Sequence, residues 1–370
     1  MTTNELFISI LRTEIFGVDF VSDDFSPSEV IEPLYEISKK HDMAHIVADF
    51  FEKRDISHPK LTKQKLLSVY RREQLDFEES SIVKVFEEAH IDYVLLKGAE
   101  IKKLYPMPFM RTSSDVDILI KPDERERAIA LLKEKRKYVL DTSAERDCSL
   151  LSRSGMNVEL HFGITANIKN LDKVLSHAWD YAIKTDGHKY IFCDEFFVFH
   201  HIAHMLTHFT EGGCGVRSFA DLALLRDRIE GCRDKLFALL AQAECDSFFD
   251  GVYALASVWF GNENHTELTK SIAEYILNGG VYGSRSNLGA TGRHKSGSYF
   301  GYIKNRIFMP KDRLRLVYPK IDKHPILIPY YQAKRWFSLL DKEKRISARN
   351  ELKGDKNHTS VDAMLTQLGL

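Results

Sequence analysis

The chain lacks a disulfide framework, a net charge and an apolar run long enough to cross a membrane. Its cysteines are odd in number and include no C-x-x-C pair, so we expect free thiols in a reducing compartment at Cys148, Cys193, Cys214, Cys232 and Cys245. A formal net charge of −1 over 370 residues gives no general attraction to nucleic acid or anionic lipid, so anion binding must come from local clusters. Apolar stretches stay well short of the roughly 20 residues that span a bilayer, and the first residues carry no basic leader or small-residue cleavage site. These absences favour a cytoplasmic protein.

What is present is the composition of a folded protein, with 44% hydrophobic and 28% charged residues. The length exceeds what one hydrophobic core usually serves, and the hydrophobic pattern changes along the chain. We expect an α+β fold in which a small mixed sheet with helices is flanked by mostly α-helical parts. The expected parts are a helical segment at 1–90, an α+β catalytic unit at 91–165, a helical domain at 166–280, and a Gly/Ser-rich basic loop with a helical tail at 281–370.

Helical periodicity dominates the first part. Apolar residues recur at helical spacing over 26–53, with a break near His41 and Asp42, and again over 61–89, which predicts a long helix. Short runs rich in Val, Ile and Leu then predict strands, with a hairpin turn at 155–157. These runs are "DYVLLKG", "DVDILIK", "KYVLDTS", "CSLLSRS" and "NVELHFGI", and "HKYIFC" is a further strand candidate inside the helical domain.

Two acids on one strand face are the strongest chemical signal. Side chains alternate along "DVDILIK", so Asp115 and Asp117 point to one face while Val116, Ile118 and Ile120 point to the core. Two carboxylates so close together raise one pKa unless a positive group lies between them. A divalent cation is the usual source of that charge.

A third acid has the same placement on a later strand. In "NVELHF", Glu159 and His161 share one face, and Val158, Leu160 and Phe162 share the other. If the two strands are neighbours in the sheet, Glu159 joins the two aspartates. Three carboxylates suit Mg²⁺ or Mn²⁺, which prefer oxygen ligands. Such a site can hold two metals that clamp the attacking and leaving oxygens of an in-line displacement.

Phosphate would need its own binding groups. Gly98 ends the first strand and precedes a short helix, "AEIKKLYP", whose backbone amides can face an anion. Lys97 and Arg111 are nearby cations that can meet a triphosphate.

This order of elements resembles the nucleotidyltransferase fold, the DNA polymerase beta-like superfamily. The wording "LLKG…LYP…R-x-x-x-D-x-D-I-L-I…V-E-L-H" is similar in particular to a bacterial family of uncharacterised nucleotidyltransferases. The resemblance implies that Gly98 is the turn glycine, that Asp115 and Asp117 bind metal, and that Glu159 is the third carboxylate, which helps to activate the attacking hydroxyl. The superfamily usually has Ser or Gly after the turn glycine, whereas Ala99 offers phosphate only its backbone amide.

The function implied is transfer of a nucleoside monophosphate from a nucleoside triphosphate, such as ATP, to an acceptor hydroxyl or phosphate. Mg²⁺ or Mn²⁺ is the expected cofactor, and the acceptor is a small molecule, a sugar phosphate, RNA or protein. Two alternatives stay open. A degenerate domain would bind nucleotide or a partner without chemistry, and Ala99 supports this reading. A glycosyltransferase would use D-x-D as its metal motif for a nucleotide sugar, but that fold normally begins with a nucleotide-binding βαβ unit.

Histidines at four-residue spacing form a further constellation on one helix face, at His200, His204 and His208. A zinc site and a domain interface are both open, and interface histidines are the commoner case. In the resembled family such a helix is followed by Gly, Arg and Asp. Arg217 and Asp221 are therefore expected to pair with each other or to contact substrate.

The last part of the chain gives weaker signals. The Gly/Ser-rich stretch at 278–302 is expected to be a mobile loop, and its basic residues can close over a phosphate substrate. The stretch at 324–345 is expected to be a basic amphipathic helix that packs on the body or on a membrane surface.

Overall fold

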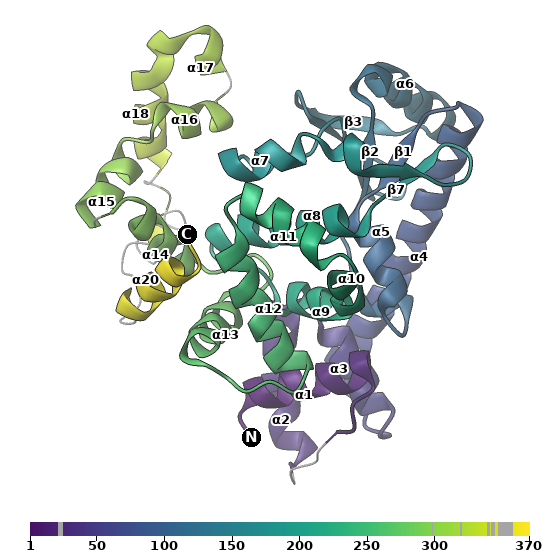
Figure 1. Ribbon diagram of the computed structural model, residues 1–370, viewed down its shortest axis with the longest axis vertical. Helices are drawn as coiled ribbons and strands as arrows, with labels where there is room; N and C mark the ends of the chain where they lie inside the picture. Colours follow the sequence, from purple (N-terminus) through teal and green to yellow (C-terminus); the bar gives the residue numbers. More distant parts are fainter. Residues whose placement is uncertain (21–24, 298, 319, 339–340, 342–344, 347–357) are drawn as a thin grey trace.

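The computed structural model describes residues 1–20, 25–297, 299–318, 320–338, 341, 345–346 and 358–370. The helices are α1 (Thr3–Phe16), α2 (Pro27–Lys40), α3 (Ala44–Glu52), α4 (Pro59–Glu88), α5 (Lys97–Ile101), α6 (Arg125–Arg136), α7 (Lys169–Leu175), α8 (Asp194–Thr210), α9 (Val216–Leu224), α10 (Arg226–Gly231), α11 (Arg233–Gln242), α12 (Asp246–Phe260), α13 (Glu267–Gly279), α14 (Arg285–Lys295), α15 (Tyr299–Ile307), α16 (Lys311–Val317), α17 (Lys320–Lys323), α18 (Ile328–Ser338) and α20 (His358–Gln367). The strands are β1 (Tyr93–Leu95), β2 (Asp115–Ile120), β3 (Val139–Ser143), β4 (Asp147–Leu151), β5 (Asn157–His161), β6 (Ala182–Lys184) and β7 (Lys189–Phe192). Figure 1 shows the sheet beside α4 and α6, the N-terminal helices at the opposite end of the body, and α14 to α20 in a separate lobe.

One mixed sheet organises the middle of the chain. Its strand order is β3-β4-β5-β2-β1-β7-β6. β2 pairs in parallel with β5, β1 pairs in parallel with β7, and the remaining neighbours are antiparallel. In the β2–β5 register Asp117 lies opposite Glu159. The two strands that carry the acids are therefore direct neighbours near the centre of the sheet.

The two faces of this sheet have different surroundings. Ile118, Ile120, Val158 and Leu160 are fully buried in a core that they share with α4 and α6. The opposite face turns toward α5 and α8, and a second core joins the N-terminal helices α1 to α3 with α8 to α13. Because side chains alternate along a strand, burial of one face forces the acids of β2 and β5 onto the other.

Most of the expected architecture is confirmed. The first part is helical, with α2 and α3 separated at His41 and Asp42, and α4 covers the expected long helix. The β4–β5 hairpin turns at Gly155, whose φ of +81° favours glycine. The sheet also extends past residue 165, because "HKYIFC" supplies β7, which pairs with β1 and carries β6 on its outer side.

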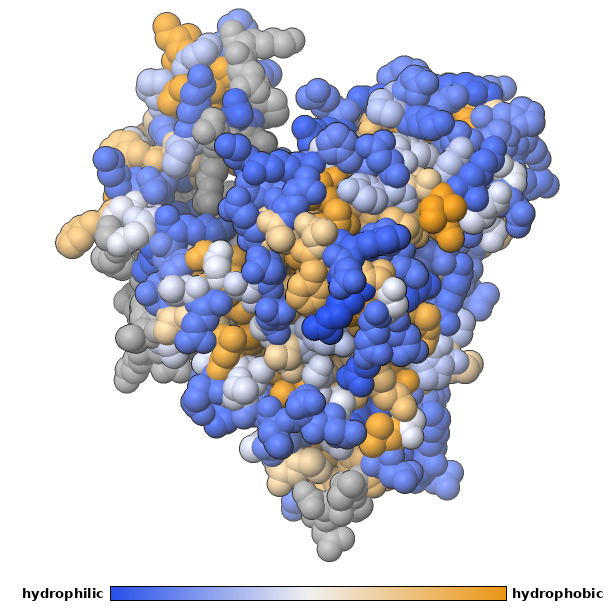
Figure 2. Space-filling model, viewed as in Figure 1, coloured by the Kyte–Doolittle hydropathy of each residue, from blue (hydrophilic) through white to orange (hydrophobic). Residues whose placement is uncertain are grey.

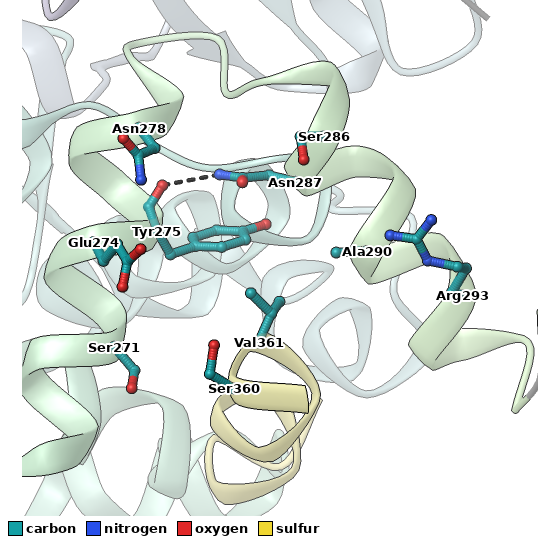
Figure 3. A pocket seen from close by; sticks show the side chains of 10 residues that line it. All are labelled: Ser271, Glu274, Tyr275, Asn278, Ser286, Asn287, Ala290, Arg293, Ser360 and Val361. Carbon is teal, nitrogen blue, oxygen red and sulfur yellow. Dashed lines mark hydrogen bonds between the residues drawn. The ribbon is translucent and has the colours of Figure 1, made fainter. Parts of the chain in front are cut away.

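The expected mobile loop is wrong for residues 285–295, which form α14. The side chain of Ser284 caps this helix by accepting a hydrogen bond from the Asn287 amide at 3.1 Å. Asn287 and Thr291 are buried, and Asn287 Nδ2 donates to Tyr275 O at 2.8 Å (Figure 3). The polar residues that suggested a loop therefore pack against α13. A cavity of about 30 Å³ remains between α13, α14 and α20, which is water-sized and too small for a substrate.

The expected tail helix is present as α18, although residues 339–340 and 342–344 of the stretch lie outside the described residues. Trp336 Nε1 donates to Ile307 O at 2.8 Å, and Tyr331 stacks on Tyr318 with ring centroids 4.3 Å apart. The aromatic residues of α18 thus contact neighbouring C-terminal segments.

The surface seen in Figure 2 is mostly hydrophilic, with apolar side chains in small separate patches. None of the helices in the described part of the chain has both the length and the apolar composition needed to span a bilayer.

Candidate active site

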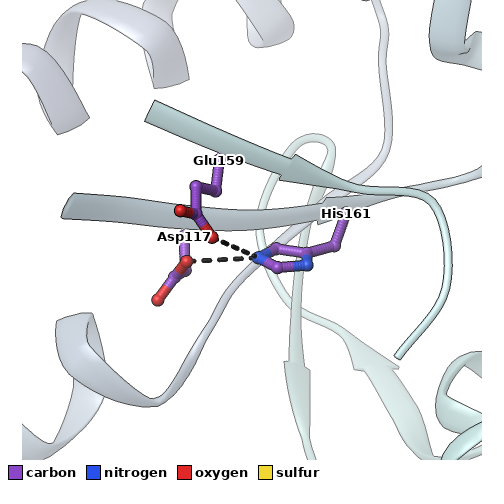
Figure 4. Close-up of side chains that lie close together, drawn as sticks. All are labelled: Asp117, Glu159 and His161. Atoms are coloured by element: carbon purple, nitrogen blue, oxygen red, sulfur yellow. Dashed lines mark hydrogen bonds and ion pairs between the residues drawn. The ribbon is translucent and has the colours of Figure 1, made fainter. Parts of the chain in front are cut away.

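Neighbouring strands bring Asp117 and Glu159 side by side, as the alternation predicted. Both side chains lie on the strand face opposite the core that contains α4 and α6, and Figure 4 shows them beside His161. His161, two residues further along β5, places Nε2 at 3.1 Å from Asp117 Oδ1 and at 3.8 Å from Glu159 Oε2. One oxygen or nitrogen from each of these three residues lies within 4.8 Å of the other two. This donor set is compact enough to surround one cation.

Asp115 shares the face of Asp117 but lies outside this compact group. Ser113 Oγ donates to Asp115 Oδ1 at 3.0 Å, and Ser114 Oγ donates to Asp115 Oδ2 at 3.1 Å. Burial and the charge of Asp117 raise the pKa of Asp115. The serines therefore orient a carboxylate that forms no ion pair among the described residues, although the charge of Lys97 reaches it.

The charges of the group explain the pKa directions. Burial raises the pKa of Glu159, and the charges of Asp117 and Asp115 add to the effect. Burial also acts to raise the pKa of Asp117, but the hydrogen bond from His161 and the charge of Lys97 outweigh it and hold that pKa below its ordinary value. For His161 burial acts to lower the pKa, and Asp117 and Glu159 together raise it. When His161 is protonated, it supplies part of the positive charge that the acids require.

Replacing His161 by Gln should lower the free energy of unfolding by about 1–2 kcal/mol in the absence of divalent cations. The raised pKa of His161 gives stability that is present below the ordinary value of 6.5 and lost as the pH rises through the folded-state pKa. The lowered pKa of Asp117 gives stability that is present above the ordinary value of 3.8 and lost as the pH falls through the folded-state pKa.

Urea unfolding with EDTA at pH 5.5 and at pH 9 tests this prediction. The difference between wild type and variant should be largest at pH 5.5 and should shrink at pH 9. A difference that does not change with pH contradicts the ion pair. His177→Gln, at an exposed histidine outside the site, is the matched control.

The acids open into a cavity of about 460 Å³ between the sheet and the helices α8 and α9. This volume falls in the range of roughly 300–1,000 Å³ that small-molecule sites occupy. The sheet side supplies four carboxylates, from Asp115, Asp117, Asp147 and Glu159. The other side supplies cations and imidazoles, from Lys97, Arg111, Arg217, His200, His201, His204 and His208. The cavity therefore lies between a group of carboxylates on the sheet and a group of cationic and imidazole side chains.

A turn between α13 and α14 adds Tyr282, which is 89% exposed, to the cavity lining. The turn is fixed by close backbone contact, since Ser284 N donates to Gly212 O at 3.2 Å. A Cβ on Gly283, whose φ is +68°, would lie 2.3 Å from the carbonyl carbon of Gly212. Only glycine fits there, and it allows the turn to hold an aromatic ring at the cavity.

A family model described as "Uncharacterised nucleotidyltransferase" matches residues 27–261. The match covers well over half of the chain. The chain belongs to this family. No curated protein and no solved structure matches it. The family match contains the whole sheet and the helices α2 to α12, whereas Tyr282 and the C-terminal lobe lie outside it.

Within this family member, Gly98 lies in the first turn of α5 and not at the end of a strand, because the helix already begins at Lys97. The Ala99 amide donates to Leu96 O at 3.0 Å, and its methyl group packs on the core, so this amide serves the helix. Lys97 lines the cavity, and no described residue accepts a hydrogen bond from its ammonium group. Burial lowers the pKa of Lys97, against the opposing charge of Asp117.

Arg111 is held mainly by a partner that the sequence did not suggest. Its Nε lies 3.0 Å from Asp221 Oδ1 and its Nη2 lies 2.9 Å from Asp221 Oδ2, while the Tyr105 hydroxyl donates to Asp221 Oδ1 at 2.8 Å. The expected pairing of Arg217 with Asp221 is wrong, because Arg217 Nη1 donates to Thr112 O at 2.9 Å. Arg217 and Asp221 do lie four residues apart on α9 and both line the cavity. Asp221 binds Arg111, whereas Arg217 binds Thr112.

The histidine row does lie along the cavity, but it does not form a metal cluster. Within the part of the chain that the structure describes, the atoms close enough to share one ion belong to the Asp117 group. His204 and His208 place their ring centroids 4.3 Å apart at an interplanar angle of 79°. Burial, with a contribution from Lys97, lowers the pKa of His200 to about 3.

Two members of the site were missed at the level of sequence. His161 shares the face of Glu159 by simple alternation, so the pattern contained the signal that it belongs with the acids. Asp147 lies opposite His161 in the β4–β5 pairing and lines the cavity. Nothing in the local pattern around Asp147 distinguishes it from an ordinary surface acid.

Proposed function

We propose that the protein transfers a nucleoside monophosphate from a nucleoside triphosphate, with ATP as the first candidate, to a hydroxyl or phosphate of an acceptor. The observation that carries the proposal is the placement of Asp117 beside Glu159 on parallel neighbours, with Asp115 on the same face, in a cavity whose other wall is cationic. Family membership favours this reaction over the nucleotide-sugar alternative.

The donor set fits a divalent cation. Carboxylates are the ligands that Mg²⁺ and Mn²⁺ prefer; Asp117 and Glu159 lie in the compact group, and Asp115 lies beside it on the same face. Burial raises the pKa values of Asp115 and Glu159, and the neighbouring carboxylates add to the effect. A bound ion would neutralise phosphoryl charge and align the reacting oxygens, and a pair of ions would clamp both of them.

The chain's own residues account for the remaining steps. In the reaction the acceptor oxygen bonds to the α-phosphorus, the bond to the β-phosphate oxygen breaks, and pyrophosphate leaves. We assign to Glu159 the proton of the acceptor hydroxyl, because this carboxylate lies beside Asp117 and lines the cavity where the acceptor would enter. Asp115, which accepts hydrogen bonds from Ser113 and Ser114, and Asp117 would hold the cation that faces the α-phosphate.

The triphosphate is assigned to the start of α5. Lys97 offers an unpaired ammonium group, and Gly98 leaves room for close approach of phosphate oxygens. Arg111 can offer Nη1 to the triphosphate, because its Nε and Nη2 already bind Asp221. This Nη1 lies 3.4 Å from the position that a Cβ on Gly98 would occupy. Ala99 contributes through the shape of the turn, since its amide is already bonded to Leu96.

Replacing Gly98 by Ala should weaken binding of a Mg²⁺–nucleoside triphosphate by about tenfold and leave the fold intact. The added methyl would meet Arg111 Nη1 at 3.4 Å and Ser113 Oγ at 3.9 Å, which are ordinary contacts, and the backbone is not left-handed there. The free energy of unfolding should stay within about 1 kcal/mol of wild type, because Ala favours a helix.

Isothermal titration calorimetry measures this affinity. Gly231→Ala, in a helix where a Cβ meets nothing within 4 Å, is the control. Unchanged affinity in Gly98→Ala would remove this glycine from the triphosphate site.

The transfer reaction itself is tested by incubating the full chain with each nucleoside triphosphate, Mg²⁺ and pools of small-molecule, sugar-phosphate, RNA and protein acceptors. Pyrophosphate release that requires both an acceptor and the metal is the expected result. Binding of Mg²⁺–triphosphate without release in any pool would instead support a domain that binds nucleotide without chemistry, which the engaged Ala99 amide favours. We place this activity in the cytoplasm, since all five cysteines are free.

A further inference from the structure

The helical wall of the cavity carries polar groups that the protein itself does not use. His204 and His208 line the cavity, and neither ring has a hydrogen-bond partner among the described residues. His200 is 6% exposed, and its Nδ1 is buried without a partner. The hydrogen bonds that Arg217 makes with described residues all come from Nη1. His200 is the buried member of this set, whereas His204 and His208 are partly buried. Polar groups that line a cavity without a protein partner can be satisfied by the acceptor oxygens of a ligand.

These groups share one chemistry. Lys97 and Arg217 are cations, and an imidazole donates one hydrogen bond when neutral and two when protonated. Burial and the charge of Lys97 lower the pKa values of His204 and His208. The positive charge on this wall therefore opposes protonation of His204 and His208, and a bound anion would offset that charge.

The acids on the helical side leave part of this charge unbalanced, because Asp221 is paired with Arg111 at 2.9 Å and the side chains of the other two acids are open to solvent. Asp42 contacts Arg217 at 3.4 Å, but its side chain is 46% exposed. Glu211, which follows α8, is exposed, although its charge does reach His208. The aspartates of β2 lie across the cavity, where the proposed function assigns them to a cation. An anion that enters between the two walls would meet the cationic wall on one side and, on the other, the cation that the proposed function assigns to the aspartates.

We propose that Lys97, His204, His208 and Arg217 form a subsite for a phosphoryl group of the substrate. A phosphoryl group carries three acceptor oxygens and up to two negative charges, which matches a ring of cationic and imidazole donors. The proposal rests on the proposed function for its choice of phosphate. The group belongs either to the nucleotide or to a phosphorylated acceptor, and the experiment separates these sources.

The experiment uses the full chain with His204→Gln and His208→Gln as separate variants. Both positions are only partly buried, and Gln keeps a polar side chain without the ring. His177→Gln is the control, since that histidine is exposed and lies outside the cavity. Inorganic phosphate and Mg²⁺ with a β,γ-imido nucleoside triphosphate are the probes, and calorimetry gives their affinities.

Each cavity variant should lose about fivefold to tenfold in affinity for at least one probe, and the control should lose none. Phosphate that still binds wild type when the nucleotide is saturating identifies the acceptor as the source. Phosphate that is displaced by the nucleotide, together with weaker nucleotide binding in the variants, identifies the nucleotide. Wild-type affinities for both probes in both cavity variants would overturn the subsite.

The same binding measurements on Asp117→Asn test the proposed function separately from the subsite. Asp117→Asn should remove Mg²⁺-dependent nucleotide binding, whereas binding of phosphate without Mg²⁺ should be as strong as in wild type or stronger, because the substitution removes a negative charge that faces Lys97. If Asp117→Asn binds the Mg²⁺–nucleotide like wild type, the proposed function fails, while the phosphate measurements still decide the subsite.

Discussion

Replacing Asp117 by Asn is expected to lower the rate of nucleotidyl transfer by about 10³-fold, which corresponds to about 4 kcal/mol of transition-state stabilisation. The carboxamide keeps the shape of the side chain but loses the charge of the acid that lies within the compact group with Glu159 and His161. The substitution breaks the ion pair with His161, which costs about 1–2 kcal/mol, but it also removes a negative charge that, after burial, raises the pKa values of Asp115 and Glu159. The fold should therefore survive the substitution with a small loss of stability.

The measurement is single-turnover formation of product and pyrophosphate over a range of Mg²⁺ concentrations, with Tm recorded for each variant. Asp123→Asn, at an exposed acid just beyond the same strand, is the matched control and should retain wild-type turnover. Asp117→Asn with more than a tenth of wild-type activity at saturating Mg²⁺ would show that this acid does not hold a catalytic cation.

Replacing Arg111 by Met should lower the free energy of unfolding by about 3–5 kcal/mol. The side chains of Arg111 and Asp221 are only 7% and 3% exposed, and the substitution leaves the Asp221 carboxylate buried with the Tyr105 hydroxyl as its remaining side-chain donor. Burial acts to raise the pKa of Asp221, but the positive charge of Arg111 holds that pKa below its ordinary value. Loss of the guanidinium removes that support.

Urea unfolding of Arg111→Met and of the double variant Arg111→Met/Asp221→Leu measures the effect. The double variant should recover part of the loss, because it no longer buries an unpaired charge. Lys103→Met breaks the exposed ion pair with Glu100 and should change stability by no more than about 1 kcal/mol. If Arg111→Met lowered the free energy of unfolding by no more than about 1 kcal/mol, the buried Arg111–Asp221 pair would not stabilise the cavity wall.

Local patterns predicted much of the fold because they report burial directly. The alternation in "DVDILIK" and "NVELHF" placed the acids opposite Ile118 and Leu160, and the sheet has this arrangement. The stretch that forms α14 was misread because Gly and Ser suggest a loop by composition. In the structure Asn287 and Thr291 bond to Tyr275 instead, and no local pattern contains that contact.

The site was predictable in part for the same reason. Asp117 and Glu159 followed from strand faces, whereas their adjacency depends on the parallel pairing of β2 and β5, which is a property of the whole sheet. The partner of Arg111 lies 110 residues away on α9, so its role in holding Asp221 is invisible in "RTSSDVD". Residues whose function depends on distant partners are therefore the ones that sequence reasoning misassigned.

Anomalous diffraction from crystals of the full chain with Mn²⁺ and a non-hydrolysable nucleoside triphosphate tests the central claim most directly. We expect an anomalous peak about 2.1 Å from carboxylate oxygens of both Asp117 and Glu159, with the triphosphate extending toward Lys97 and Gly98. A nucleotide bound elsewhere, or Mn²⁺ that contacts neither carboxylate at saturating concentration, would contradict the metal-dependent transfer proposed for this cavity.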